Sequence, residues 1–244
     1  MYHKIEKIRY PIRNFYSEFL LQLSFVTTPT PPPLNLAQRW LLASRPKTLP
    51  AAVSPVVIAW SIAIDQGCFD LLPALATFAI AVLLQIGANL VNDVSDFQKG
   101  ADNCDRLGPL RVTQAGLLSP RQVWGGVIVV FGLAALAGFY LILLKGWLVL
   151  LLGAACIAAA LVYSVGRYSF AALGLGDLFA LLFFGFGALC GTVYVLCGSV
   201  ALIAWLAAVP VGCLVTAILV VNNIRDIESD RRAGRKNIPV LLGR

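Results

Sequence analysis

The sequence predicts an all-α, polytopic membrane protein, built as a bundle of about six transmembrane helices. Apolar residues make up 59% of the chain and charged residues only 13%, whereas soluble domains average ~25% charged residues. Mean hydropathy is +0.82. Six apolar stretches come close to the ~20 residues that a helix needs to cross a bilayer. A single histidine, His3, excludes most histidine-based acid–base chemistry and zinc sites.

Residues 1–38 form an N-terminal tail and a proline-rich linker. The tail is basic, and residues 28–33 read Thr-Pro-Thr-Pro-Pro-Pro. The apolar run of residues 19–26 is too short to span a bilayer and lacks a small-residue cleavage site, so we do not expect a signal peptide. The membrane domain therefore occupies residues 39–244.

Six spans follow the linker, and each is expected to be helical. They cover roughly residues 49–64, 71–92, 123–144, 147–165, 175–197 and 200–223. Small residues inside these spans allow helix backbones to approach closely. The glycines expected to do so are Gly87, Gly153, Gly185, Gly187 and Gly212.

Lys and Arg lie almost entirely on one side of these spans. In this arrangement Lys145 alone falls in a connection on the other side. Because basic residues accumulate on the cytoplasmic side of membrane proteins, we expect a cytoplasmic N-terminus in a multi-pass protein of the cell (inner) membrane. The lipid bilayer is then a partner, and the net charge of +7 needs no nucleic acid to explain it.

The six cysteines form no CxxC pair, and four of them lie in apolar runs. They are Cys68, Cys104, Cys156, Cys190, Cys197 and Cys213. We expect them to be small apolar residues in the reduced form, with no metal or redox role.

Two acidic clusters stand out on the side that carries the basic residues. The first holds Asn89, Asn92, Asp93 and Asp96, and the second holds Asn222, Asn223, Asp226 and Asp230. Spacings of three and four place most of each set on one face of a helix end. Like charges so placed repel each other, and Mg²⁺ with carboxylate, amide and phosphate oxygens would relieve that repulsion.

The two helix ends, if they face each other, would form a cage for a Mg²⁺–diphosphate. Basic side chains nearby would neutralise the remaining phosphate charge. The candidates are Lys99, Arg106, Arg111 and Arg225. The alternative interpretation is a pair of solvated helix ends with capping Asn and Asp residues; two similar clusters on the same side favour the cage.

These residues resemble the motifs of a known family. Asn-Asp-x-x-Asp at 92–96 and Asp-x-x-x-Asp at 226–230 are similar to the paired motifs of the UbiA-type intramembrane prenyltransferase superfamily. Three further strings resemble its 1,4-dihydroxy-2-naphthoate branch in menaquinone synthesis: Arg-Pro-Lys-Thr-Leu-Pro at 45–50, Lys-Gly-x-Asp at 99–102 and Asp-Arg-Leu-Gly-Pro-Leu-Arg at 105–111. The resemblance covers roughly residues 39–243.

The resemblance implies an all-helical bundle of usually nine spans around a central cavity. It also implies Mg²⁺-dependent transfer of a polyprenyl group from its diphosphate to 1,4-dihydroxy-2-naphthoate, with decarboxylation, giving demethylmenaquinone. Asp93, Asp96, Asp226 and Asp230 then match the catalytic metal–diphosphate acids. Asn89 and Asn222 match the accompanying amides, and Lys99 and Arg225 match residues that hold phosphate oxygens. Asn92, Asn223 and Arg106 lie close to these positions and are further substrate-binding candidates.

Other site residues rest on weaker arguments. Tyr163 matches a tyrosine near the reacting centre, although a tyrosine there is also typical of the membrane interface. Arg45, Lys47 and Arg111 are candidates for binding the acceptor carboxylate.

The chain departs from the family pattern at two places. Gly100 stands where the superfamily often has a third acid, and Asp102 follows instead, as in the naphthoate branch. Residues 237–244 resemble the entry to a seventh span, so about three spans are missing and the domain is expected to be incomplete at its C-terminus.

Other functions stay open at this point. A related aromatic prenyltransferase with a different acceptor and a non-catalytic fragment of such an enzyme both fit the acidic clusters. A transporter fits less well, because transporters place their sites near the middle of the membrane on interrupted helices, whereas these acids lie at helix ends.

Overall fold

The computed structural model describes residues 34–100, 110–165, 173–232 and 234–243, and these residues are helical throughout, apart from turns and connections. The elements are α2 (Leu36–Ser44), η2 (Pro46–Thr48), α3 (Leu49–Asp65), α4 (Leu71–Gln98), α5 (Pro120–Lys145), α6 (Trp147–Ser164), α8 (Gly176–Ala180), η3 (Leu181–Cys190), α9 (Gly191–Cys197), α10 (Leu202–Arg225), α11 (Ile227–Arg232) and α12 (Ile238–Leu242). No strand occurs in these ranges. The all-α fold class is confirmed.

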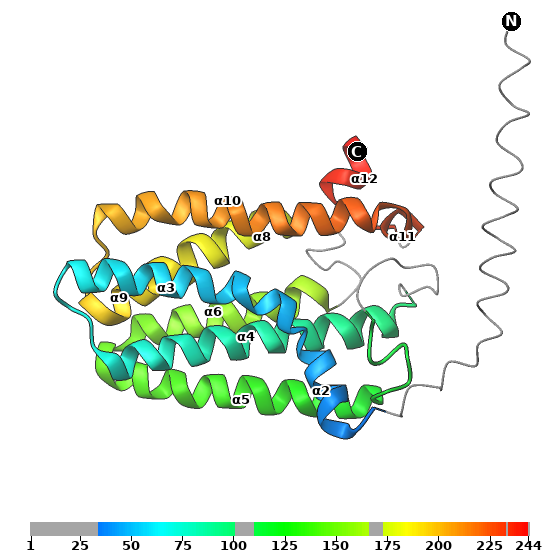
Figure 1. Cartoon of the computed structure of the whole chain (residues 1–244), viewed down its shortest axis with the longest axis horizontal. Helices are drawn as coiled ribbons and strands as arrows, with labels where there is room; N and C mark the ends of the chain where they lie inside the picture. The colour runs from blue at the N-terminus through cyan, green and yellow to red at the C-terminus, as the bar shows by residue number, and fades with distance from the viewer. Residues whose placement is uncertain (1–33, 101–109, 166–172, 233, 244) are drawn as a thin grey trace, which may run out of the picture. The chain divides into compact units, whose positions relative to one another are not determined.

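Six of the helical segments in the described part of the chain are long and apolar enough to cross a membrane. Consecutive spans run in opposite directions, side by side (Figure 1). They agree with the six expected spans, with one instructive difference. Helix α4 continues to Gln98, beyond the expected end of this span at residue 92, so the first acidic motif lies on the last turns of a helix, as expected.

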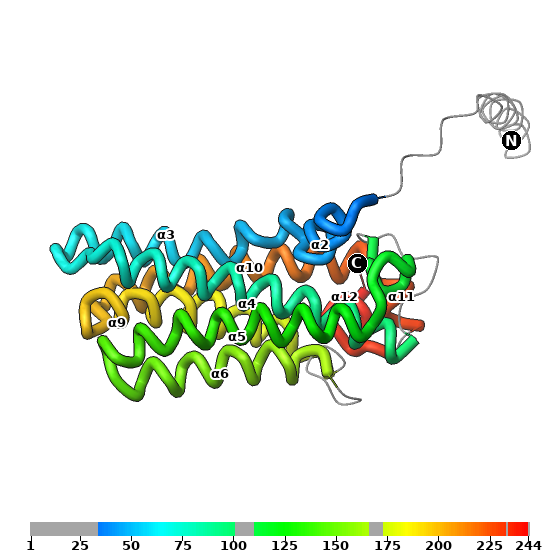
Figure 2. The backbone as a smooth tube through the Cα atoms, turned by 90° about the horizontal axis from the view of Figure 1, so that it is seen from below, coloured from blue at the N-terminus to red at the C-terminus, as the bar shows by residue number. Residues whose placement is uncertain are grey.

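Two hydrophobic clusters divide the bundle into halves. Leu90 and Val94 of α4 pack with Val123 and Val127 of α5 in the first cluster. The second cluster joins α3, η3, α9 and α10 around residues such as Leu189. We call α2, α4, α5 and α6 the α4–α5 half, and α3, α8, η3, α9 and α10 the α3–α10 half. Each half therefore carries one acidic motif, at the end of α4 or of α10 (Figures 1 and 2).

Helices η3 and α10 touch backbone to backbone at two glycines. A Cβ atom added to Gly185 would lie 2.6 Å from the carbonyl oxygen of Ala208, and one added to Gly212 would lie 2.9 Å from that of Leu181. η3 is a π-helix, a form with wider turns than an α-helix. The close approach expected at Gly185 and Gly212 is thus present.

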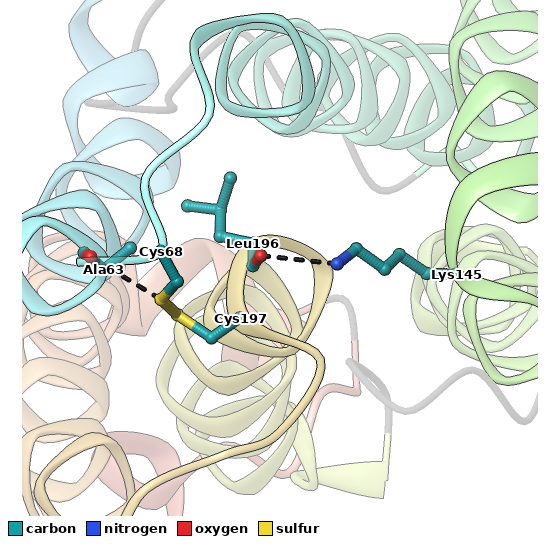
Figure 3. The surroundings of a disulfide bond; sticks show 5 residues. All are labelled: Ala63, Cys68, Lys145, Leu196 and Cys197. Carbon is teal, nitrogen blue, oxygen red and sulfur yellow. Dashed lines mark hydrogen bonds between the residues drawn. A yellow bond between two sulfur atoms is a disulfide. The ribbon is translucent and has the colours of Figure 1, made fainter. Parts of the chain in front are cut away.

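The end of the bundle away from the acidic motifs contains a disulfide bond. Cys68, in the connection between α3 and α4, is joined to Cys197, the last residue of α9, with 5.1 Å between their Cα atoms (Figure 3). The prediction that the cysteines are all reduced is wrong for this pair. The spacing of 129 residues gave no hint of the bond, because only the antiparallel course of the helices brings the two thiols together.

Lys145 lies at the same end. Its Nζ donates a hydrogen bond of 3.3 Å to the carbonyl oxygen of Leu196, beside the disulfide (Figure 3). Cations favour the C-terminal carbonyls of helices, which lack partners in the helix. Lys145, the basic residue expected on the other side of the membrane, therefore has a structural role, because it binds the C-terminal end of α9.

Candidate active site

Asp93 holds the connection between α4 and α5 against the helix that carries the first motif. Its side chain is buried and accepts hydrogen bonds from the backbone N–H groups of Val112 (3.1 Å) and Thr113 (3.0 Å). Arg45 approaches the same carboxylate at 3.8 Å. A buried carboxylate needs such partners because an isolated one is strongly disfavoured. Asp93 thus organises the site as well as carrying charge.

Arg45 adopts a left-handed backbone conformation, with a φ of 52°. For a residue with a Cβ atom this conformation costs about 1–2 kcal/mol. It lies between α2 and η2, just before Pro46. The turn directs the guanidinium of Arg45 toward Asp93.

Asp96 lies one turn further along α4 and is bound by two arginines. Nη2 of Arg111 is 2.6 Å from Oδ2, and Nη2 of Arg235 is 2.6 Å from Oδ1. The Asp96 side chain is 4% exposed. Charge-assisted bonds of this length are among the stronger contacts in proteins, and they neutralise the acid from two sides.

Asn89 ties α4 to the segment before the first span. Its Nδ2 donates to the carbonyl oxygen of Ser44 (2.9 Å) and to Oγ1 of Thr48 (2.8 Å). Gln85 also donates to Thr48, at 3.3 Å. In the residues that the structure describes, Asn89 thus contacts protein groups and positions the chain around Arg45.

Asn92 and Lys99 both contact the end of α6. The hydroxyl of Ser164 donates to Oδ1 of Asn92, and Nζ of Lys99 donates to the carbonyl oxygen of Ser164. Burial lowers the pKa of Lys99, and the charge of Arg235 adds to this, while Asp96 opposes it. Ser164 was not anticipated from the sequence, because a serine at a helix end gives no distinctive signal.

The second motif lies at the junction of α10 and α11. Asp226 follows α10 directly, is buried, and accepts a two-pronged contact from the Nε (2.9 Å) and Nη2 (2.8 Å) of Arg225. Asp230 lies within α11 and accepts a 2.7 Å hydrogen bond from Nδ2 of Asn237. Both acids are held at the end of the α3–α10 half.

Arg235 joins the two motifs. Its Nη2 contacts Asp96, and its Nη1 donates to Oδ1 of Asp230 at 3.1 Å. Burial by itself would lower the pKa of Arg235, but the charges of Asp96 and Asp230 and the hydrogen bond to Asp96 raise it on balance. The two helix ends therefore face each other, as the cage interpretation requires, with a guanidinium between them.

Tyr163 lies in the last turn of α6. A Cβ atom added to Gly176, at the start of α8, would come within 3.1 Å of the Tyr163 hydroxyl. The next residue, Ser164, contacts Asn92 and Lys99. Tyr163 is thus held near the first motif, and its role near the reacting centre stays a prediction.

The remaining predicted residues are less closely involved. Lys47 is exposed in η2, and Asn222 and Asn223 are half-buried in the last turn of α10. Arg106 lies outside the described residues. Sequence reasoning missed Arg235 and Asn237, although both follow closely after Asp230.

The donor set suits a magnesium ion, since it consists of carboxylate and amide oxygens. Arg235 touches both Asp96 and Asp230, so carboxylates from the two motifs share one guanidinium. The described residues contain no group of three or more acidic, histidine or cysteine side chains gathered around one point. In this arrangement the acids contact arginines, Asn237 and backbone N–H groups.

The chain can be classified by its match to a protein family. The model of the UbiA prenyltransferase family matches residues 52–244, which include both motifs. The chain belongs to this family. It is a multi-pass membrane protein, as the six long apolar helices among its described residues indicate.

Curated relatives of this UbiA family member carry more specific names. The 1,4-dihydroxy-2-naphthoate octaprenyltransferase of Escherichia coli (strain K12) is 38% identical over 218 residues, which are 86% of this chain and 70% of the relative. The protein of the same name from Mycobacterium tuberculosis is 38% identical over 205 residues, covering 84% of this chain and 70% of the relative. Human UbiA prenyltransferase domain-containing protein 1 is 33% identical over 210 residues, covering 84% and 61%.

Proposed function

We propose that this chain transfers a polyprenyl group from its diphosphate to 1,4-dihydroxy-2-naphthoate, with release of diphosphate and carbon dioxide, giving the hydroquinone form of demethylmenaquinone. The observation that carries the proposal is the meeting of the two acidic helix ends through Arg235. The names of the relatives support the choice of acceptor.

The acids at the two helix ends are proposed to hold Mg²⁺ and the diphosphate. Asp96 and Asp230 are the acids nearest to the junction, and Asp226 and Asp93 flank them. When bound, Mg²⁺ neutralises charge on the departing diphosphate. The guanidinium and ammonium groups of Arg225, Arg235 and Lys99 would add hydrogen bonds to its oxygens.

The apolar helices are proposed to shield the reacting centre from water. An allylic cation survives only where water is excluded, and an aromatic ring face stabilises it. Tyr163 directly precedes Ser164, which contacts Asn92 and Lys99, and is the aromatic side chain proposed for that role. The electron-rich naphthoate ring then attacks the cation, and loss of carbon dioxide restores its aromaticity without a histidine base.

We further propose that the chain lies in the inner cell membrane, with the acidic end cytoplasmic. Basic residues are concentrated at that end, and the disulfide lies at the other. Disulfides form and persist in oxidising compartments. The position of this disulfide therefore supports the same orientation as the distribution of basic residues, and the two arguments are independent.

The test is a transfer assay in membranes that contain the full chain. Supplied with 1,4-dihydroxy-2-naphthoate, octaprenyl diphosphate and Mg²⁺, the wild type should form a prenylated naphthohydroquinone, detected by mass spectrometry together with the quinone that oxygen in air forms from it. An Asp226→Asn variant should lose at least about 100-fold in rate, because the charge that holds the metal–diphosphate is gone.

Two controls separate the acceptor from the site. Replacing the naphthoate with 4-hydroxybenzoate should abolish product, and a chelator should abolish the product formed with the naphthoate. Transfer to 4-hydroxybenzoate alone would reject the naphthoate assignment, and an inserted wild-type chain that transfers to neither would reject the proposed activity for this chain.

A further inference from the structure

Arg235 occupies oxygen atoms that a metal ion would need. It contacts Oδ1 of Asp96 at 2.6 Å and Oδ1 of Asp230 at 3.1 Å. The other oxygen of Asp96 is bound by Arg111, and the other oxygen of Asp230 by Asn237. Every oxygen of these two carboxylates is therefore engaged by a protein donor.

A divalent cation and the guanidinium of Arg235 compete for this place. Both are cations that bind the same carboxylate oxygens, and two cations at one such pair of oxygens repel each other. Binding of a metal by Asp96 and Asp230 must therefore displace Arg235 at least in part.

Arg235 has more freedom to move than the other arginine on Asp96. The side chain of Arg111 is 3% exposed, whereas that of Arg235 is 22% exposed. Arg235 also lies between two short helices, α11 and α12, directly after Gly234, whose φ is 71°. Arg111 is thus a fixed partner of Asp96, and Arg235 is an exchangeable one.

We propose that Arg235 is a placeholder cation that alternates between two partners. In the absence of ligand its guanidinium neutralises Asp96 and Asp230. When a divalent cation binds these carboxylates, the side chain of Arg235 turns and its guanidinium binds the diphosphate. The inference rests on the proposed function, because it takes the diphosphate from it. The planar fork of arginine matches phosphate oxygens as well as carboxylate oxygens, so one side chain serves both states.

The proposal predicts opposite effects of one substitution on two affinities. In Arg235→Gln the carboxylates lose their competitor, so Mn²⁺ alone, followed by electron paramagnetic resonance, should bind about 10-fold more tightly. Octaprenyl diphosphate, measured by equilibrium binding with saturating Mg²⁺, should bind about 10-fold more weakly, because a charge-assisted contact is lost. A role confined to holding the fold would weaken both.

Two further variants complete the experiment. Arg231→Gln removes an arginine of the same segment whose contact is an exposed 3.4 Å pair with Glu228, and it should leave both affinities unchanged. Arg235→Lys keeps the charge without the fork; it should bind Mn²⁺ with nearly wild-type affinity and octaprenyl diphosphate with intermediate affinity. Should Arg235→Gln fail to fold, the lysine variant decides.

The outcomes are separable from those of the transfer assay. Parallel losses of both affinities, or no change in either, would overturn the placeholder role. A wild type that binds Mn²⁺ and octaprenyl diphosphate with opposing shifts in the variant, yet makes no product, would leave the placeholder standing and reject the proposed transfer.

Discussion

At the scale of single residues, the acids of the two motifs have different structural duties. Asp93 accepts two backbone hydrogen bonds from the connection to α5, whereas Asp226 contacts the adjacent, partly exposed Arg225. Substituting either acid should impair transfer, but the cost in stability should differ. An activity measurement alone would not reveal this difference.

We therefore predict that Asp93→Ala lowers stability by about 2 to 4 kcal/mol, because the buried N–H groups of Val112 and Thr113 lose their acceptor. Asp226→Ala should cost less than about 1 kcal/mol, since its partner Arg225 can turn to water. The midpoint of thermal denaturation in detergent measures both. Equal losses for the two variants would contradict the assignment of Asp93 to the connection.

The candidate acids could be identified from the sequence, but their partners could not. The spacing of Asp93, Asp96, Asp226 and Asp230 placed them at two helix ends, and the structure brings those ends together. Arg235 was not among the candidate site residues, because its contact with Asp96 depends on tertiary structure. A basic residue five positions after Asp230, directly behind a glycine, was the available signal.

At the scale of elements, glycines show how far a sequence pattern can go. Gly185 and Gly212 do permit close approach, and Gly87 lies against the ring of Phe131. Gly153 has open space where a Cβ atom would be. Sequence alone gave all of them the same interpretation, because it does not show which face of a transmembrane helix meets a neighbour.

Alanine substitutions at a glycine in close contact and at a glycine beside open space are therefore predicted to change stability in opposite directions. Gly185→Ala places a Cβ atom 2.6 Å from the Ala208 carbonyl oxygen, so η3 and α10 must separate, at a cost of about 1 to 3 kcal/mol. Gly138→Ala, in α5, meets nothing within 4 Å and should raise stability by up to about 1 kcal/mol through helix propensity. Thermal denaturation in detergent compares the two variants. If both are more stable than the wild type, η3 and α10 separate at Gly185 without an energetic cost, and the prediction is wrong.

At the scale of the whole molecule, the six spans were predictable from hydropathy because each is a continuous apolar run of bilayer length. The disulfide was not, because it depends on which helix ends become neighbours. The disulfide nevertheless helps to determine which side of the membrane each end of the bundle faces.

The orientation is tested by labelling cysteines in intact cells. Ser199→Cys lies in the exposed connection between α9 and α10, at the disulfide end, and Ala115→Cys is exposed in the connection between α4 and α5, at the acidic end. With the three unpaired cysteines of the described residues and Cys104 replaced by serine, an impermeant maleimide should label Ser199→Cys only. Labelling of Ala115→Cys alone would reverse the proposed orientation.

The α4–α5 half and the α3–α10 half are joined by different kinds of contact at the two ends of the bundle. Near the disulfide, apolar side chains of α9 pack with both halves, for example Leu196 with Ala63 and Ala74, and Val195 with Leu141. At the acidic end the link between the motifs is the ion pair of Arg235 with Asp96. The disulfide end is thus held covalently and by burial, whereas at the acidic end Arg235 bridges the motifs beside the hydrogen bonds of Asn89 and Gln85 to Thr48. A reductant should therefore loosen one end of the bundle and high salt the other, because thiols open a disulfide whereas dissolved ions screen a charge pair.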